Sequence, residues 1–210
     1  MITNVLAKDI PHKKPTETFR AESMNADAPE MQLVRRMAAN DPAALEELYA
    51  LYGQRLFAYA VRLTGDPARA EDVLQDSLVA AWKAAGRFRG EGRVIAWLLS
   101  IVHNTALKSL RRPTFEISEV MEETLPAADA PLEEQAQRSQ QAHRLREGLQ
   151  SLSPEHRAVL ELVFYQGMSM EESAQICRCP VGTVKSRLNY AKAALRGVLT
   201  RAGINGEDVK

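Results

Sequence analysis

The sequence is poor in cysteine and has no long apolar run, and both shortages exclude classes of function. Its 210 residues include only two cysteines, Cys177 and Cys179, and the nearest histidine, His156, lies well upstream. A structural metal site needs about four ligands, so we expect no metal, and Cys177 is better interpreted as a small core residue. No apolar run approaches the roughly 20 residues that span a bilayer, and the N-terminus lacks the apolar block of a secretory signal. We therefore expect a cytoplasmic protein without membrane insertion.

Sequence signatures of catalysis are also missing. No histidine stands with a nucleophile and an acid at a recognisable spacing, and there is no glycine-rich loop of the kind that holds phosphates. Glu171 and Glu172 form an adjacent acidic pair, but helix capping explains them. We therefore expect neither an enzyme nor a bound cofactor.

A net charge of one sign is the third absence, since 27 basic and 27 acidic residues cancel. The charges are nevertheless segregated along the chain. Residues 83–112 contain seven basic residues and one acidic residue, whereas residues 113–137 contain seven acidic residues and no basic one. Such segregation is expected of a protein with dedicated surfaces for phosphate, and it outweighs the argument from net charge against nucleic-acid binding.

The stretch from 169 to 199 predicts a helix, a sharp turn and a second helix. Ser169 followed three residues later by Glu172 is a capping box, which satisfies backbone N–H groups at the start of a helix. Pro180 cannot continue that helix but can begin a new one. The turn therefore lies near Arg178 and Cys179. Helix-turn-helix turns usually carry glycine where Arg178 stands, and a left-handed arginine there costs about 1–2 kcal/mol.

The second of these helices has an apolar face and a basic face. Its apolar stripe is Val184, Leu188, Ala191, Leu195 and Leu199. No acidic residue occurs between Pro180 and Arg201, and lysines and arginines gather away from the apolar stripe. A phosphate backbone favours this face, and small polar residues at its start can reach base edges in a major groove. The alternative is an amphipathic surface helix with solvated lysines. We favour DNA recognition because the capping box, the turn near Arg178 and the basic face all indicate a helix-turn-helix that binds DNA.

Two helices with the same kind of start are predicted in the first half of the chain. Asp41-Pro42 and Asp66-Pro67 each join an N-cap to a proline at the first helical position. The first helix, ended by Gly65, has an expected buried stripe of Leu45, Leu48, Tyr49, Tyr52, Leu56, Tyr59 and Leu63. The second is ended by Gly86. We expect the two to pack as an antiparallel pair.

A basic loop, RFRGEGR at 87–93, follows these helices and leads into a third apolar stripe that includes Val94 and Trp97. Arginines for phosphates and an aromatic wall for an unstacked base are suited to a nucleic-acid single strand. The alternative is that Phe88 and Trp97 fill a helical core. Trp97 can have both roles. Phe88 lies in the loop, and this position favours a role in nucleic-acid binding.

These patterns predict an all-α protein with two helical domains. We place an N-terminal tail at 1–28, the first domain at 29–112, a flexible acidic linker at 113–137, the second domain at 138–201 and a C-terminal tail at 202–210.

Two blocks of the sequence resemble the extracytoplasmic-function (ECF) group of bacterial sigma factors in the sigma-70 family. Residues 43–112 are similar to their region 2, and residues 145–199, with LSPEHRAVLEL and CPVGTVKSRL, are similar to region 4. No segment resembles the intervening region 3 of larger members. The resemblance implies a protein that binds RNA polymerase core enzyme, recognises promoter DNA at its −10 and −35 elements, and is held inactive by an anti-sigma protein.

The resemblance also assigns roles to residues. Core-polymerase binding is implied for Asp72, Gln75 and Asp76, although stabilisation of the helix dipole is by itself a sufficient reason for the carboxylates among them. Contact with −10 DNA is implied for Phe88, Arg89, Arg93, Trp97, Asn104, Lys108, Arg111 and Arg112, with Phe88 and Asn104 at a pocket for a flipped base. Contact with −35 DNA is implied for Thr183, Lys185, Ser186, Arg187, Asn189, Tyr190 and Lys192. Housekeeping members have a tryptophan pair where this chain has Trp97-Leu98, which predicts weaker melting.

A stand-alone helix-turn-helix regulator is the alternative function. Its first domain would sense a signal or dimerise. The two functions differ in one observable property, because a regulator binds its operator alone, whereas a sigma factor binds promoter DNA strongly only with core polymerase.

Overall fold

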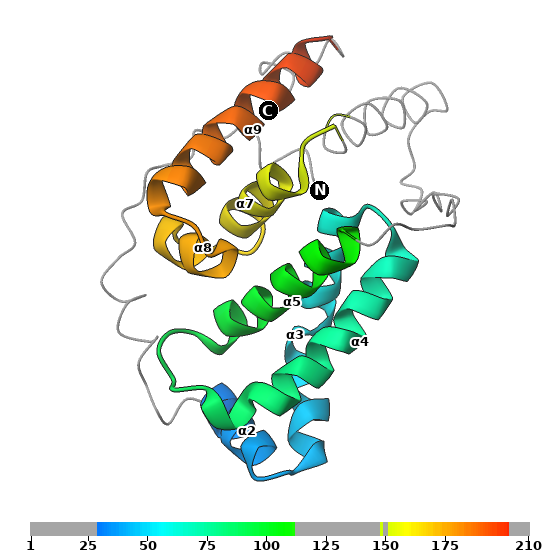
Figure 1. Cartoon of the computed structure of the whole chain (residues 1–210), viewed down its shortest axis with the longest axis vertical. Helices are drawn as coiled ribbons and strands as arrows, with labels where there is room; N and C mark the ends of the chain where they lie inside the picture. Colours follow the sequence, from blue (N-terminus) through cyan, green and yellow to red (C-terminus); the bar gives the residue numbers. More distant parts are fainter. Residues whose placement is uncertain (1–28, 112–147, 149–150, 202–210) are drawn as a thin grey trace, which may run out of the picture.

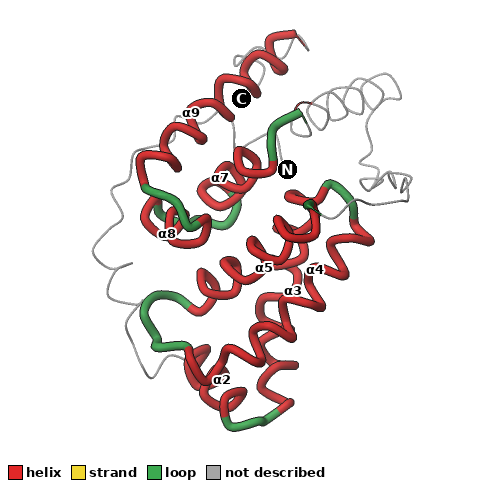
Figure 2. The backbone as a smooth tube through the Cα atoms, in the orientation of Figure 1, coloured by secondary structure: helices red, strands yellow, loops and turns green. Residues whose placement is uncertain are grey.

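The computed structural model describes residues 29–111, 148 and 151–201, and within these ranges every regular element is a helix (Figures 1 and 2). The all-α prediction is thereby confirmed for the part of the chain that is described. The predicted linker at 113–137, the predicted tails at 1–28 and 202–210, and Arg112 lie outside the described residues. None of the described helices is long and apolar enough to cross a membrane.

The first unit runs from residue 29 to residue 111. It consists of α2 (Pro29–Ala38), α3 (Pro42–Thr64), α4 (Pro67–Ala84), the 3-10 turn η2 (Ala85–Arg87) and α5 (Val94–Leu110). The predicted caps are confirmed, because Asp41 and Asp66 accept hydrogen bonds from the backbone N–H groups of Ala43 and Ala68 at 3.1 and 3.0 Å. Gly65 ends α3 at φ 73°, a left-handed conformation in which glycine is not strained. Helices α3, α4 and α5 pack against one another.

Details of the first unit differ from the sequence analysis. No helix is predicted over 29–38, yet α2 forms there because Leu33, Val34 and Met37 pack into the core. Tyr49 is predicted to be buried but is 50% exposed, and its ring lies over Gly53, where a Cβ atom would approach it to 2.7 Å. Helix α4 ends two residues before Gly86 and continues as η2.

The second unit is the predicted helix-turn-helix with one helix before it. It contains α7 (Pro154–Phe164), α8 (Met170–Cys177) and α9 (Val181–Arg201). The capping box is present in both directions: the Glu172 N–H donates to Ser169 Oγ at 3.1 Å, and the Ser169 N–H donates to Glu172 Oε2 at 2.8 Å. Arg178 is left-handed, with φ 50° and ψ 47°, at the position where glycine is usual. The predicted apolar stripe of α9 is buried as far as it is described, at Val184, Leu188, Ala191 and Leu195.

The two units share one hydrophobic core. Leu162 of α7, Met168 in the turn before α8, and Ile176 of α8 are buried in the same cluster as Leu56 and Leu98 of the first unit. Helix α8 packs on α5, and α7 packs on α3, so the helix-turn-helix lies directly against the first unit (Figure 1).

A buried polar pair lies inside this core. The Tyr59 hydroxyl and His103 Nδ1 form a 2.8 Å hydrogen bond, and the two residues are 0% and 2% exposed. Burial, with a smaller contribution from the nearby positive charge of Arg187, lowers the pKa of His103 from 6.5 to about 4. The imidazole is therefore neutral in the folded protein at neutral pH.

We expect the free energy of unfolding to fall by about 2 kcal/mol between pH 7 and pH 5 on account of His103 alone. The unfolded chain protonates His103 near pH 6.5, but the folded chain does so only near pH 4. Acid therefore stabilises the unfolded state, and the loss is complete once the pH falls below about 4. Urea denaturation at both pH values, compared with His103→Gln, isolates this contribution. An equally steep pH dependence in His103→Gln would contradict the assignment.

Candidate nucleic-acid and protein-binding surfaces

The exposed face of α9 carries most of the residues predicted to read DNA. Lys185, Ser186, Asn189, Tyr190 and Lys192 are exposed, while Thr183 and Arg187 are half-buried. Within α9 no acidic residue occurs, so this face is basic and polar throughout. It can therefore approach a phosphate backbone without repulsion.

Neighbouring side chains hold parts of this face in place. The ring of Tyr190, 61% exposed, packs against His156 of α7 with ring centroids 4.5 Å apart. The Lys192 ammonium lies over the ring of Phe164 at 5.1 Å. Arg187 is turned toward the edge of the apolar stripe, with its Nη1 atom 3.9 Å from Cys179 Sγ. None of these contacts involves Lys185 or Asn189, two exposed polar residues near the start of the helix.

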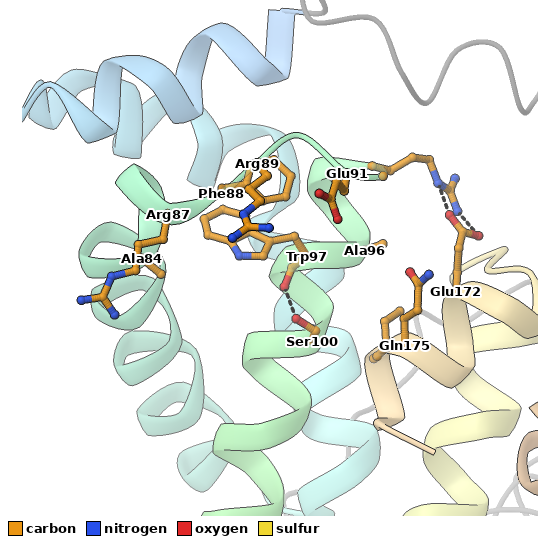
Figure 3. Close-up of a pocket in the computed structure, with 13 residues that line it drawn as sticks. Ala84, Arg87, Phe88, Arg89, Glu91, Ala96, Trp97, Ser100, Glu172 and Gln175 are labelled. Atoms are coloured by element: carbon orange, nitrogen blue, oxygen red, sulfur yellow. Dashed lines mark hydrogen bonds and ion pairs between the residues drawn. The ribbon is translucent and has the colours of Figure 1, made fainter. Parts of the chain in front are cut away.

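A hollow of about 340 Å³ lies between the basic loop and the helix-turn-helix (Figure 3). Phe88 and Trp97 stack at its wall, with ring centroids 4.7 Å apart and planes at 24°. Arg89 and Arg93 also line it. The facing wall is formed by Glu172, Gln175 and Ile176 of α8. The sequence analysis did not place α8 here, and no local pattern could have shown it.

The structure does not bring all the predicted −10 residues to this hollow. Asn104 is not among its lining residues; its side-chain amide donates to the carbonyl of Ser100, one turn back along α5. Lys108 and Arg111 are exposed at the far end of the same helix. Leu98, compared above with the second tryptophan of housekeeping members, is 2% exposed and belongs to the core. The aromatic hollow and the basic end of α5 are thus two separate parts of one surface.

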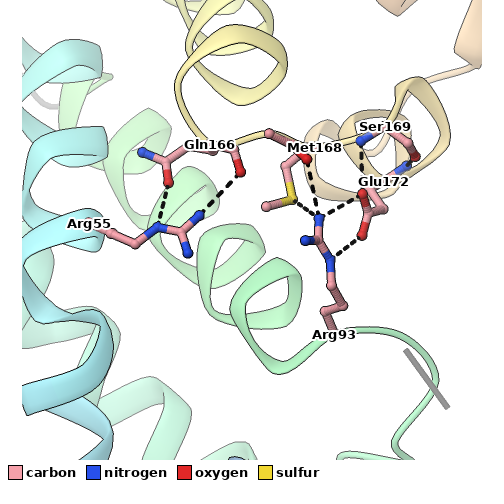
Figure 4. Close-up of polar contacts among 7 residues, drawn as sticks. Arg55, Arg93, Gln166, Met168, Ser169 and Glu172 are labelled. Carbon is pink, nitrogen blue, oxygen red and sulfur yellow. Dashed lines mark hydrogen bonds and ion pairs between the residues drawn. The ribbon is translucent and has the colours of Figure 1, made fainter. Parts of the chain in front are cut away.

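Arg93 is bound to the second unit (Figure 4). Its Nε and Nη2 atoms donate to the two carboxylate oxygens of Glu172 at 2.7 and 2.9 Å, which is a bidentate ion pair. Nη2 also lies 3.5 Å from the Gly167 carbonyl oxygen and 3.2 Å from Met168 Sδ. Nearby, Arg55 of α3 donates to the side-chain and backbone oxygens of Gln166 at 3.3 and 3.2 Å. Glu172 therefore serves both the capping box and a contact between units.

An acidic face is exposed on α4. Asp72, Gln75 and Asp76 point away from the core, which α4 contacts through Val73 and Leu74. Val79, one turn further along the same face, is 52% exposed although it is apolar. Acidic side chains around an exposed apolar residue are suited to a protein partner with a basic surface.

Cys177 fits its predicted role in packing. It is half-buried and lies against the core that the two units share and against a smaller cluster within the second unit. Burial raises the pKa of its thiol to about 12, so the thiol stays protonated at neutral pH. Among the residues described, no group of three metal-ligating side chains lies close enough to hold a metal ion.

A helix-turn-helix with a basic face, packed on a helical unit with an aromatic hollow and an acidic helix, is the arrangement expected of a bacterial transcription initiation factor.

Sequence comparisons with known families and proteins support the same class of protein. Residues 48–115 match the family described as Sigma-70 region 2, and residues 142–195 match Sigma-70, region 4. The ECF RNA polymerase sigma factor SigL of Mycobacterium tuberculosis is 34% identical over 177 residues, covering 83% of this chain and 99% of that protein. The RNA polymerase sigma-H factor of Pseudomonas aeruginosa is 33% identical over 176 residues, covering 79% and 91%. The chain belongs to the ECF sigma factors of the sigma-70 family.

Two solved structures of sigma factors have a fold similar to that of this chain. CnrH, in complex with the cytosolic domain of CnrY, matches with a TM-score of 0.59 and 26% identity over 80% of this chain and 96% of that chain. The sigma factor RpoE of Bartonella quintana, in complex with the anti-sigma factor NepR, matches with a TM-score of 0.58 and 27% identity over 74% and 96%.

Proposed function

We propose that this protein is a promoter-specificity subunit that acts in the cytoplasm without catalysis of its own. It binds core RNA polymerase through α4, the −10 element through the basic loop and α5, and the −35 element through α9. The exposed acidic face of α4 carries this proposal, because a stand-alone DNA-binding regulator has no need of it. Neither Asp72 nor Asp76 takes part in an ion pair among the described residues.

At the −10 element, the aromatic hollow provides a place for an unpaired base. A base leaving the duplex loses its stacking on its neighbours, and the Phe88–Trp97 wall offers an aromatic surface in exchange. Arg87 and Arg89 are exposed beside the hollow and can bind the phosphates on either side of that base. Lys108 and Arg111 extend the basic surface along α5 toward the adjoining duplex.

At the −35 element, α9 enters the major groove with its N-terminal half. Lys185 and Asn189 stand four residues apart on one face and are both exposed, so they reach the same groove. Asparagine pairs with adenine edges, while lysine binds guanine edges or phosphates.

We also propose an anti-sigma protein as a partner. The solved complexes of CnrH and of the Bartonella sigma factor support this proposal, since both hold a sigma factor of the same fold with its regulator.

Run-off transcription with purified core polymerase on genomic promoter fragments tests the proposed function. We expect discrete transcripts that require this protein, and footprints on −35 and −10 DNA that require core enzyme. A strong footprint by the protein alone, without any transcript, would instead support the stand-alone regulator.

Phe88→Ala is expected to weaken holoenzyme binding to a −10 single strand about tenfold, because base–aromatic stacking contributes about 1–3 kcal/mol per base. The measurement is fluorescence anisotropy with a labelled −10 oligonucleotide. Tyr190→Ala, which removes an exposed aromatic from α9, is the matched control and should leave this affinity unchanged. Equal affinities for wild type and Phe88→Ala would show that the hollow receives no base.

A further inference from the structure

Tyr190 borders the exposed polar face of α9. It lies in the N-terminal half of that helix, one residue after Asn189 and about one helical turn after Ser186. Its side chain is 61% exposed, so much of the ring is open to a ligand. Tyr190 therefore stands beside the residues that, on the proposed function, enter the −35 groove.

The contact that holds Tyr190 comes from outside α9. The imidazole of His156, in the first turn of α7, packs on the Tyr190 ring with centroids 4.5 Å apart and planes at 37°. Aromatic rings at this separation attract each other beyond the area that they bury. His156 therefore restricts the rotation of the Tyr190 side chain.

His156 is in turn held at the start of α7. Ser153 Oγ forms a 2.7 Å hydrogen bond with His156 Nδ1 and accepts the backbone N–H of His156 at 3.5 Å. The first contact orients the imidazole, and the second fixes the backbone that carries it. Because His156 is also half-buried, it forms a fixed support for the Tyr190 ring.

Two apolar clusters fix α7 against α9. Val159 of α7 is buried in one cluster with Val184 of α9, and Leu160 of α7 is buried in the other with Leu195 of α9. Figure 1 shows α7 beside α9 at this contact. The place of His156 on α7 therefore determines where the Tyr190 ring is held on the surface of α9.

An aromatic ring held at the edge of a major groove favours one chemical group. The base edges there present hydrogen-bond donors and acceptors, and the apolar group among them is the C5-methyl of thymine. A ring that is already held loses little further freedom when it binds, which strengthens the contact. A tyrosine that rotated freely would lose that freedom on binding.

We propose that His156 is a positioning residue for −35 recognition, which holds the Tyr190 ring where it contacts the methyl group of a thymine. The inference rests on the proposed function, because it adds a base preference to the DNA surface of α9. His156 acts through Tyr190 and not through a base contact of its own.

The test measures the affinity of the full chain, with core polymerase present, for a −35 duplex selected from a random-sequence pool. Each thymine is replaced in turn by deoxyuridine, which removes only the methyl group. We expect one replacement to lower wild-type affinity about fourfold, the factor that corresponds to one buried methyl-sized group. The same replacement should have no effect in Tyr190→Ala and about a twofold effect in His156→Ala. Tyr165→Ala, which removes a partly exposed ring next to the end of α7, is the matched control and should keep the wild-type profile.

The unmodified duplex shows whether His156 acts through Tyr190. We expect Tyr190→Ala to lower affinity about tenfold and His156→Ala about fivefold, while the double variant should bind no more weakly than Tyr190→Ala alone. His156→Phe keeps a ring against Tyr190 and should restore wild-type affinity. Thermal denaturation shows whether each variant is folded, and a loss of folding would lower affinity for every duplex equally.

Three outcomes would overturn the inference. A deoxyuridine profile that is the same in wild type and Tyr190→Ala would show that the ring contacts no thymine methyl group. A uniform loss of affinity in Tyr190→Phe would show that the hydroxyl binds a phosphate instead. A further loss in the double variant would show that His156 acts independently of Tyr190.

Failure of the proposed function is a distinct result, in which no transcript requires this chain together with core polymerase. Selection from the same pool without core polymerase then supplies a duplex that the chain binds alone. The same variants on that duplex decide whether His156 positions Tyr190.

Discussion

Asp72→Lys combined with Asp76→Lys is expected to lower affinity for core RNA polymerase at least about a hundredfold and to abolish run-off transcription. Both carboxylates are exposed on one face of α4, together with Gln75 and the apolar Val79. Truncating one member of a buried charged pair at a protein interface costs about 2–5 kcal/mol, and reversing its charge adds repulsion. We therefore expect two such changes on one helix face to raise the dissociation constant so far that binding is no longer detected at micromolar concentrations.

The fold should tolerate this double change. In the structure Asp72 lies more than one turn beyond the Asp66 cap, where the helix dipole has little effect, so the dipole does not explain these carboxylates as the sequence analysis allowed. Neither carboxylate forms an ion pair among the described residues. Thermal denaturation should confirm a nearly unchanged melting temperature. Glu46→Lys with Glu171→Lys is the matched control, since it changes the net charge equally at exposed positions on α3 and α8. If that control lost core binding to the same degree, net charge rather than the α4 face would govern the interaction.

Binding of isolated core enzyme to a surface-immobilised sigma factor measures the affinity without DNA. This separation matters because a defect in promoter recognition also abolishes transcription. The double variant should fail before DNA is added, whereas variants in α9 should bind core normally.

Local sequence signals predicted the helix boundaries well. The capping box of Ser169 and Glu172 and the Asp-Pro starts at 41 and 66 involve residues only two or three positions apart, so they can be recognised without knowing how the rest of the chain packs. Helix α2 has no such signal. It is stabilised by the burial of Leu33, Val34 and Met37 against helices that lie later in the sequence. Contacts between residues far apart in the sequence cannot be predicted from a local pattern.

The candidate surfaces were predictable to different extents for the same reason. Helical periodicity separates the buried stripe of α9 from its exposed basic face, and the structure confirms the buried part that is described. The hollow next to Phe88 could not be predicted in full, because its second wall comes from α8. Arg93 and Glu172 are 79 residues apart, and the charge of each is explained locally, by the basic loop and by the capping box. Only the packing of the two units shows that they meet.

Lys185→Ala combined with Asn189→Ala is expected to lower transcription from the cognate promoter about a hundredfold while leaving core binding intact. Each side chain is exposed near the start of α9, and a good contact to a base edge contributes about 1–3 kcal/mol of discrimination. Neither residue packs in the core, so the helix-turn-helix should fold normally. Measuring holoenzyme affinity for promoter duplexes with every base at each −35 position locates the lost contacts.

The two single variants should differ in kind. Asn189→Ala should relax the preference at one base pair, because only a base-edge contact carries sequence information. Lys185→Ala should lower affinity for all sequences and reduce the slope of log affinity against log salt by about one if its ammonium binds a phosphate, and it should relax one position if it binds a base. Arg196→Ala removes an exposed charge from the same stripe seven residues beyond Asn189, and it should have only a small effect. A loss as large in Arg196→Ala as in the double variant would place the groove contact further along α9 and contradict recognition by its N-terminal half.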